Sequence, residues 1–66
     1  MKIHILGICG TFMGGLAQIL IEKGHQVSGS DQQFYPPMSD QLHALGIEMI
    51  AGYNSSNMPV ADLYVI

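Results

Sequence analysis

The stretch from Ile3 to Gly15 constrains the fold of this chain more than any other. A mostly apolar run from Lys2 to Leu6, with β-branched isoleucine at two positions, is typical of a β-strand. Glycines follow at positions 7, 10, 14 and 15, and an apolar pattern with helical spacing begins among them. The pattern predicts a strand, a tight turn and the first turn of a helix.

A glycine-rich turn at such a junction allows the backbone to approach a ligand closely, and the free N–H groups of the helix's first turn favour negative charge. We therefore expect a phosphate or diphosphate at the four glycines. The dinucleotide fingerprint G-x-G-x-x-G, started at Gly7, requires glycine where the chain has Cys9 and Phe12. The alternative is that the glycines serve only the turn and the packing of helix on strand.

Asp31 is a second feature that points to a nucleotide. It ends a short strand expected over residues 25–31. In a nucleotide-binding βαβ unit, an acidic side chain roughly 20 residues after the glycine turn accepts hydrogen bonds from ribose hydroxyls. The alternative is an ordinary loop or cap residue, because aspartate is common after strands.

The rest of the chain alternates between strands and helices. After the first strand we expect a helix from about Phe12 or Met13 to Lys23, closed by Gly24. The second strand is followed by a helix capped by Ser39 and ended by Gly46, a strand over residues 47–50, a polar loop over 52–59 and a strand over 61–66. This order predicts an α/β fold, a Rossmann-like parallel sheet with flanking helices, right-handed crossovers and a ligand crevice at the carboxyl ends of the strands.

The apolar positions indicate how this sheet is covered. In the first helix, a helically spaced set is expected to face the sheet, with Gln18 and Glu22 toward water: Met13, Leu16, Ala17, Leu20 and Ile21. Hydrophobic residues make up 48% of the chain and charged residues 11%. That composition favours a parallel sheet with helices on both faces.

Charge and cysteine content exclude several classes of function. Lys2 and Lys23 are the only basic residues in 66, and the net charge is −3, so nucleic-acid binding is not expected. No run reaches the roughly 20 apolar residues of a membrane span, and the amino terminus does not resemble a signal peptide. Cys9 and three widely separated histidines make no metal site. A free cysteine beside a ligand loop fits a reducing compartment, so we expect the cytoplasm.

Two further stretches are informative. Phe34 and Tyr35 precede two prolines, which hold both rings on a stiff loop; an exposed ring could stack on a base, and a buried ring would pin the loop to the core. The last six residues read as a buried strand with no closing turn. We therefore expect the chain to be a fragment of a larger multidomain protein, truncated at its carboxyl-terminal end.

Three stretches of the sequence resemble those of a known protein family. The strings that carry the resemblance are Gly7-Ile8-Cys9-Gly10-Thr11-Phe12-Met13-Gly14-Gly15-Leu16-Ala17, then Gly24-His25-x-Val27-x-Gly29-Ser30-Asp31, then Tyr35-Pro36-Pro37-Met38-Ser39. They are similar to the amino-terminal, UDP-sugar-binding domain of the Mur ligases, over essentially the whole chain. The Tyr-Pro-Pro-Met-Ser loop and the residues at positions 9 and 12 favour the members of cell-wall recycling over those that attach L-alanine.

The resemblance implies a function for the longer protein. It would be an ATP- and Mg²⁺-dependent amide ligase that joins the tripeptide L-Ala-γ-D-Glu-meso-diaminopimelate to UDP-N-acetylmuramate through an acyl phosphate. The chain has no G-x-x-x-x-G-K-[ST] loop. In the family that loop belongs to the central domain, and the carboxyl-terminal domain holds most of the peptide. Residues 1–66 alone are therefore expected to be inactive, with no cofactor and no catalytic residue of their own.

The resemblance also implies which residues face the UDP-sugar. The loop containing Gly10, Thr11, Phe12, Met13, Gly14 and Gly15 would face the diphosphate through backbone amides, after the turn at Gly7. Asp31 would lie by the uridine. Tyr53 stands where related ligases often have histidine near the nucleotide.

Other titratable residues have weaker claims to a role. His4, His25 and His43 are interpreted as strand, turn and helix-surface residues, because none is next to a plausible nucleophile. Cys9 lies in the ligand loop as a candidate reactive thiol without an assigned catalytic role.

Two other classes of function compete with the ligase. The glycine turn and Asp31 are also compatible with the dinucleotide-binding half of an NAD-dependent oxidoreductase, which Cys9 and Phe12 disfavour. A non-catalytic nucleotide sensor is the third possibility. Sequence beyond residue 66 would distinguish these classes, because a P-loop there favours the ligase.

Overall fold

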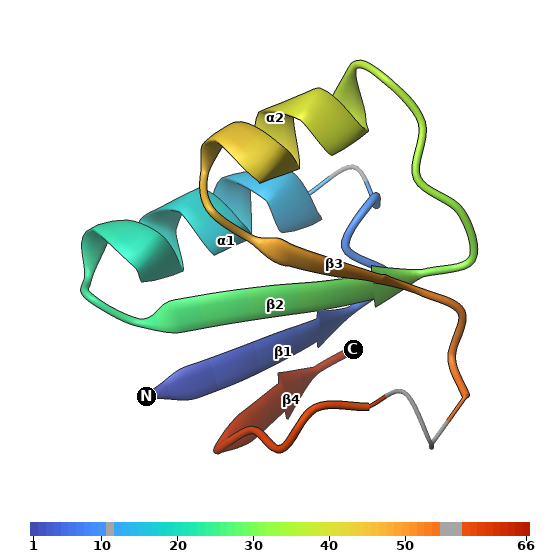
Figure 1. Ribbon diagram of the computed structural model, residues 1–66. Helices are drawn as coiled ribbons and strands as arrows, with labels where there is room; N and C mark the ends of the chain where they lie inside the picture. Colours follow the sequence, from blue (N-terminus) through green and yellow to red (C-terminus); the bar gives the residue numbers. More distant parts are fainter. Residues whose placement is uncertain (11, 55–57) are drawn as a thin grey trace.

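A computed structural model describes residues 1–10, 12–54 and 58–66 of the chain. The elements follow the predicted order, with two helices between the first three strands (Figure 1). Their bounds are β1 Lys2–Leu6, α1 Met13–Glu22, β2 Gln26–Asp31, α2 Met38–Ala44, β3 Glu48–Ala51 and β4 Leu63–Val65.

The four strands form one parallel sheet in the order β3-β2-β1-β4, which confirms the predicted α/β class. In the register, Ile3 of β1 lies between Val27 of β2 and Leu63 of β4. The chain builds the sheet from β1 toward β3, then returns to place β4 on the other side of β1 (Figure 1). The order therefore reverses at β1, and open α/β sheets bind ligands at the carboxyl ends of the strands beside such a reversal.

Both helices cover the same face of the sheet (Figure 1). The steps from β1 to β2 and from β2 to β3 run in one direction, and right-handed crossovers then place α1 and α2 on one side. The expectation of helices on both faces was therefore wrong for the part of the chain that the structure describes. The physical reason is that the described residues between β3 and β4, 52–54 and 58–62, form no helix that could cover the other face.

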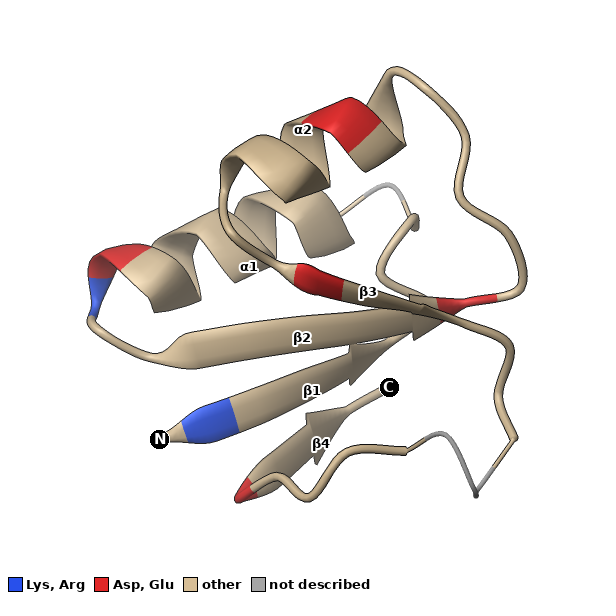
Figure 2. Cartoon of the chain, viewed as in Figure 1, with Lys and Arg blue, Asp and Glu red and all other residues tan. Residues whose placement is uncertain are grey.

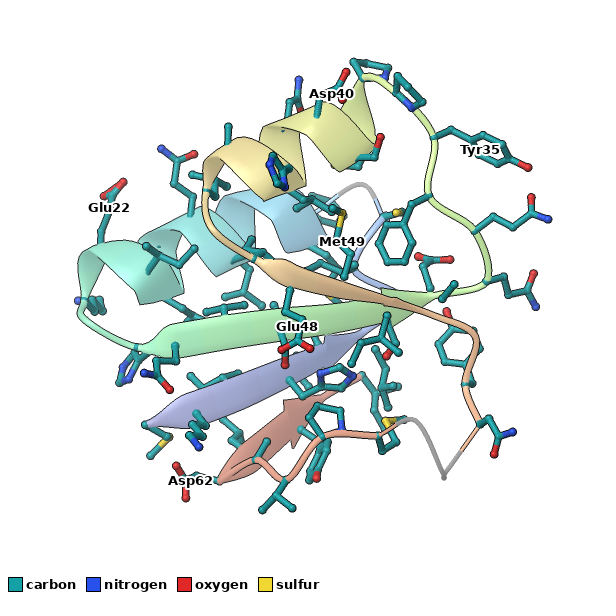
Figure 3. The ribbon with its side chains drawn as sticks, viewed as in Figure 1. Glu22, Tyr35, Asp40, Glu48, Met49 and Asp62 are labelled. Carbon is teal, nitrogen blue, oxygen red and sulfur yellow. The ribbon has the colours of Figure 1, made fainter. Side chains whose placement is uncertain are left out.

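The core lies between the helices and the sheet. Its buried residues are Ile3, Ile5, Ile8, Ala17, Val27, Leu42 and Ile47. Met13, Leu20 and Ile21 of α1 pack against it as predicted, while Leu16 is half-buried outside this cluster. In Figure 3, Met49 points from β3 toward the helices and Glu48 points to the opposite face.

The face of the sheet opposite the helices carries a polar ladder. The ring of His4 is fully buried, with Nδ1 2.7 Å from the Ser28 hydroxyl and Nε2 2.7 Å from the Ser30 hydroxyl. Tyr64 of β4 packs edge-on against it, with ring centroids 6.0 Å apart. Burial lowers the pKa of His4, against the opposing effect of the Glu48 charge. His4 is therefore a strand residue in a satisfied environment, as interpreted from the sequence.

Element ends differ from expectation by small amounts. Helix α1 ends one residue early, and Gly24 closes it with a φ of +91°. The predicted cap at Ser39 was wrong: α2 begins at Met38 after Pro37, whose fixed φ suits a helix start, and no side chain caps it. Strand β3 begins one residue late and β4 is shorter than expected. No helix among the described residues has the length and apolar character needed to cross a membrane.

Candidate functional site

The candidate site lies where β1 and β2 end, around the loop that follows Gly7. Gly7 has a φ of +77°, a left-handed conformation that turns the chain out of the strand. Its N–H and that of Ile8 both donate to the Ser30 carbonyl, at 2.8 and 3.1 Å. The Gly10 N–H then donates to the Gly7 carbonyl at 2.9 Å. The first part of the loop is therefore a closed turn fastened to the end of β2.

Ile8 explains why this turn sits so close to the sheet. Its side chain is fully buried and rests on Gly29 of β2. A β-carbon at Gly29 would lie 2.2 Å from Cδ1 of Ile8, a distance that no pair of non-bonded carbon atoms tolerates. This contact between Ile8 and Gly29 was not predicted from the sequence. A glycine inside a strand is the signal that could have found the contact, because it often marks a close approach of another segment.

Asp31 points back into the glycine loop. Its Oδ2 accepts the Cys9 N–H at 2.9 Å and its Oδ1 accepts the Gln32 N–H at 2.8 Å. Its main-chain carbonyl accepts the Gly52 N–H at 2.7 Å, which brings the turn after β3 to the same place. In this structure the Asp31 carboxylate therefore binds the protein's own backbone.

Tyr53 joins this cluster through the same turn. A β-carbon at Gly7 would lie 4.0 Å from the Tyr53 hydroxyl oxygen. Burial, the charge of Asp31 and a hydrogen bond to its carboxylate raise the pKa of Tyr53. The ring remains 46% exposed, so one edge is open to a ligand.

Cys9 is half-buried beside Asp31, and its environment suppresses its reactivity. Burial, followed by the charge of Asp31 and a hydrogen bond to it, raises the pKa of the Cys9 thiol. The thiolate is the nucleophilic form, so a raised pKa makes the group less reactive at neutral pH. The structure therefore argues against Cys9 as a reactive thiol.

The second half of the loop is arranged differently from the first. Thr11 lies outside the described residues, and Phe12 precedes α1 with its ring 85% exposed. Met13 begins α1 and packs against the core. A β-carbon on Gly14 would lie 3.8 Å from the Met38 sulfur of α2, and Gly14 and Gly15 both line a groove between the two helices. A β-carbon at Gly14 would thus make only ordinary van der Waals contact, and one at Gly15 would meet no atom within 4 Å, so the approach of α1 and α2 does not require glycine at either position.

The two aromatic rings of the loop after β2 lie in different environments, so each fits a different one of the two interpretations. Phe34 is partly buried against the core and pins the loop. Tyr35 is 65% exposed and points away from the sheet in Figure 3, with its hydroxyl donating to the Gln33 side chain. His43 is exposed on α2, as interpreted.

Among the residues that the structure describes, Asp31 alone brings charge to the site. The two lysines of the chain, Lys2 and Lys23, lie at the start of β1 and just after α1, at the end of the sheet opposite the glycine loop (Figure 2). No group of three or more His, Cys, Asp or Glu that could hold a metal ion occurs among the described residues. An anion at this loop would therefore be bound by backbone amides and the dipole of α1, without a cationic side chain from residues 1–66.

Comparison with known proteins places the chain in a family. Residues 2–66 match the model described as "Mur ligase family, catalytic domain". The chain is 58% identical, over its whole length, to the UDP-N-acetylmuramate–L-alanyl-γ-D-glutamyl-meso-2,6-diaminoheptandioate ligase of Escherichia coli K12. It is 47% identical, over 97% of its length, to the UDP-N-acetylmuramate–L-alanine ligase of Clostridium acetobutylicum.

A solved structure agrees with this result. The crystal structure of a murein peptide ligase from Psychrobacter arcticus matches 98% of the chain with a TM-score of 0.90 and 53% identity. The chain spans 15% of the length of the E. coli relative and 14% of the P. arcticus protein. The matched region is thus a small part of much longer proteins.

Proposed function

Because this chain belongs to the Mur ligase family, we propose that residues 1–66 form the amino-terminal, UDP-sugar-binding portion of an ATP-dependent amide ligase. The complete protein joins the tripeptide L-Ala-γ-D-Glu-meso-diaminopimelate to UDP-N-acetylmuramate in peptidoglycan recycling, in the cytoplasm. The observation that carries the proposal is the 58% identity to the E. coli tripeptide ligase along the whole chain. The runner-up is an L-alanine ligase, which the 47% identity to the C. acetobutylicum protein supports less well.

In this proposal the nucleotide lies at the carboxyl ends of β1 and β2. The diphosphate contacts the loop between Gly10 and Gly15, and the uridine lies near Asp31 and Tyr53. Because the N–H groups of residues 7–10 are already engaged within the protein, the diphosphate takes its donors from the start of α1. Without a cation nearby, binding to residues 1–66 alone is weak.

ATP and Mg²⁺ belong to the remainder of the protein. Residues 1–66 contain no P-loop sequence, and the described residues gather no cluster of metal-ligating side chains. The residues present therefore do not fit either group. Although the matching family model is described as a catalytic domain, we propose that residues 1–66 alone hydrolyse no ATP and form no amide bond.

Titration of the ¹⁵N-labelled chain tests the nucleotide site. UDP-N-acetylmuramate and UDP should shift the amide resonances of the residues between Gly10 and Gly15, and NAD should shift them weakly or not at all. The amide of Asp40, on the exposed side of α2, serves as the internal control. Stronger binding of NAD than of UDP would contradict the ligase and favour the oxidoreductase.

The activity requires the complete protein. With ATP, Mg²⁺ and UDP-N-acetylmuramate, it should release phosphate when the tripeptide is supplied and much less when L-alanine is supplied. The reverse preference would establish the runner-up. Turnover by the 66-residue chain above a blank without protein would show that a catalytic site lies within it.

A further inference from the structure

We propose that Asp31 is the positioning residue of the glycine loop: its carboxylate fixes the turn after β1 against the end of β2 before any ligand binds. This role is separate from nucleotide recognition, because it concerns contacts within the protein alone. It holds whether the ligand is a UDP-sugar or another nucleotide.

The main chain alone fastens only the first part of the loop. The Ser30 carbonyl accepts the N–H groups of Gly7 and Ile8, and the Ile8 side chain rests on Gly29. The next donor along the loop, the Cys9 N–H, finds its acceptor in a side chain, the Asp31 carboxylate at 2.9 Å. Hydrogen bonds with an ionised partner are about twice as strong as neutral ones.

The carboxylate is itself held in place for this contact. Its second oxygen accepts the Gln32 N–H at 2.8 Å, and the Gly52 N–H anchors the Asp31 carbonyl at 2.7 Å. The residue that follows Asp31 therefore holds its side chain, and the turn after β3 holds its main chain. A carboxylate fixed in this way sets the position of the Cys9 amide.

The contact couples the loop to the place where a ribose is expected. A carboxylate offers about four acceptor positions; the amides of Cys9 and Gln32 occupy two of them, and the Tyr53 hydroxyl and the Cys9 thiol also hydrogen-bond to the group. A sugar hydroxyl that binds Asp31 must compete with these partners, on the same group that positions the loop. Loss of nucleotide binding in an Asp31 variant therefore does not by itself show a direct contact with the ligand.

The test compares two variants of the ligand-free chain by amide hydrogen exchange. Asp31→Asn and Asp40→Asn remove the same charge, and Asp40 lies exposed on α2 (Figure 3). Exchange at Cys9 is taken relative to exchange at Ile5 in the central strand, which separates local opening from global unfolding. We expect Asp31→Asn to raise this ratio roughly 10- to 100-fold, the range for losing one charge-assisted hydrogen bond, and Asp40→Asn to leave it unchanged. Equal ratios in the two variants overturn the proposal.

A second measurement needs no substitution and decides the matter if Asp31→Asn fails to fold. In the unmodified, ¹⁵N- and ¹³C-labelled chain, NMR should detect a scalar coupling across the hydrogen bond between the Cys9 amide nitrogen and the carboxyl carbon of Asp31. Absence of this coupling, in a spectrum that shows the one between the Gly7 amide and the Ser30 carbonyl, overturns the proposal. Because this measurement uses no ligand, its failure would not contradict the proposed UDP-N-acetylmuramate site, which the nucleotide titration tests separately.

Discussion

Replacing Gly29 with alanine tests how the glycine loop rests on the sheet. The new β-carbon would lie 2.2 Å from Cδ1, 2.7 Å from Cβ and 2.8 Å from Cγ2 of Ile8. Carbon atoms prefer separations of about 3.5–4.0 Å. The Ile8 Cβ cannot rotate away, because it is attached directly to the loop backbone. Either the loop or β2 must therefore move.

The size of the effect follows from two opposing terms. Overpacking of a filled core costs about 1–3 kcal/mol, and replacing a strand glycine by alanine returns about 0.5–1 kcal/mol in conformational entropy. Because all three contacts are shorter than 3.0 Å, the overpacking cost should lie in the upper part of its range. We therefore expect Gly29→Ala to lower the free energy of unfolding by about 1–2 kcal/mol, seen as a lower urea midpoint at an unchanged m value.

Gly15→Ala is the matched control for this substitution. A β-carbon at Gly15 would meet no atom within 4 Å, and the residue lies in α1. Alanine is more favourable than glycine in a helix by about 0.8–1.0 kcal/mol, so this variant should be more stable than the parent.

A double-mutant cycle with Ile8→Ala completes the experiment. That substitution removes Cγ2 and Cδ1 and leaves the Cβ at 2.7 Å, so it relieves only part of the clash. The two costs should therefore be non-additive, with a coupling of roughly 0.5–3 kcal/mol. A Gly29→Ala variant as stable as the parent, or strictly additive costs, would refute the contact between loop and strand.

Three further predictions concern titratable groups. Burial lowers the pKa of His4 from 6.5, so the unfolded chain binds a proton at a higher pH than the folded chain, and the free energy of unfolding should fall as the pH drops below 6.5. Urea denaturation across pH should show that this pH dependence is lost in His4→Gln and kept in the exposed control His43→Gln. The pKa of Tyr53 should fall toward its ordinary value in Asp31→Asn, leaving the part due to burial; ring-carbon NMR would measure it, and an unchanged pKa would count against the Asp31 contact. Iodoacetamide should alkylate Cys9 more slowly in the folded than in the urea-unfolded chain, and faster in Asp31→Asn than in the parent, because the thiolate is the reactive form; a folded rate equal to the unfolded one would contradict the raised pKa.

Local patterns predicted the elements of this fold well. Strand β1, the turn at Gly7 and the helix that Gly24 closes are determined by residues within a few positions of each other. The same holds for the parallel arrangement, since strands and helices alternate. The start of α2 was placed at Ser39 because Ser is a strong cap, whereas the fixed φ of Pro37 begins the helix without one.

Features that depend on distant residues could not be predicted in the same way. The contact of Ile8 with Gly29 and the hydrogen bond from Cys9 to Asp31 join positions about 20 residues apart, and each residue alone has an ordinary local explanation. The helices were expected on both faces because composition reports how much surface is buried and not on which side. The strand order decides that question, and it is a property of the whole chain.

The central place of β1 between β2 and β4 has a consequence for the order of folding. Its contacts with β2 close loops of 24 residues, whereas its contact with the residues just before β4 spans 60. The longer closure costs about 0.8 kcal/mol more in chain entropy, and only three paired residues of β4 stabilise the contact against this cost. We therefore expect β4 to join last and to open first, so that its amides exchange ahead of those in β2. Each such opening would remove Tyr64 from the ring of His4 and hydrate a histidine that is otherwise fully buried.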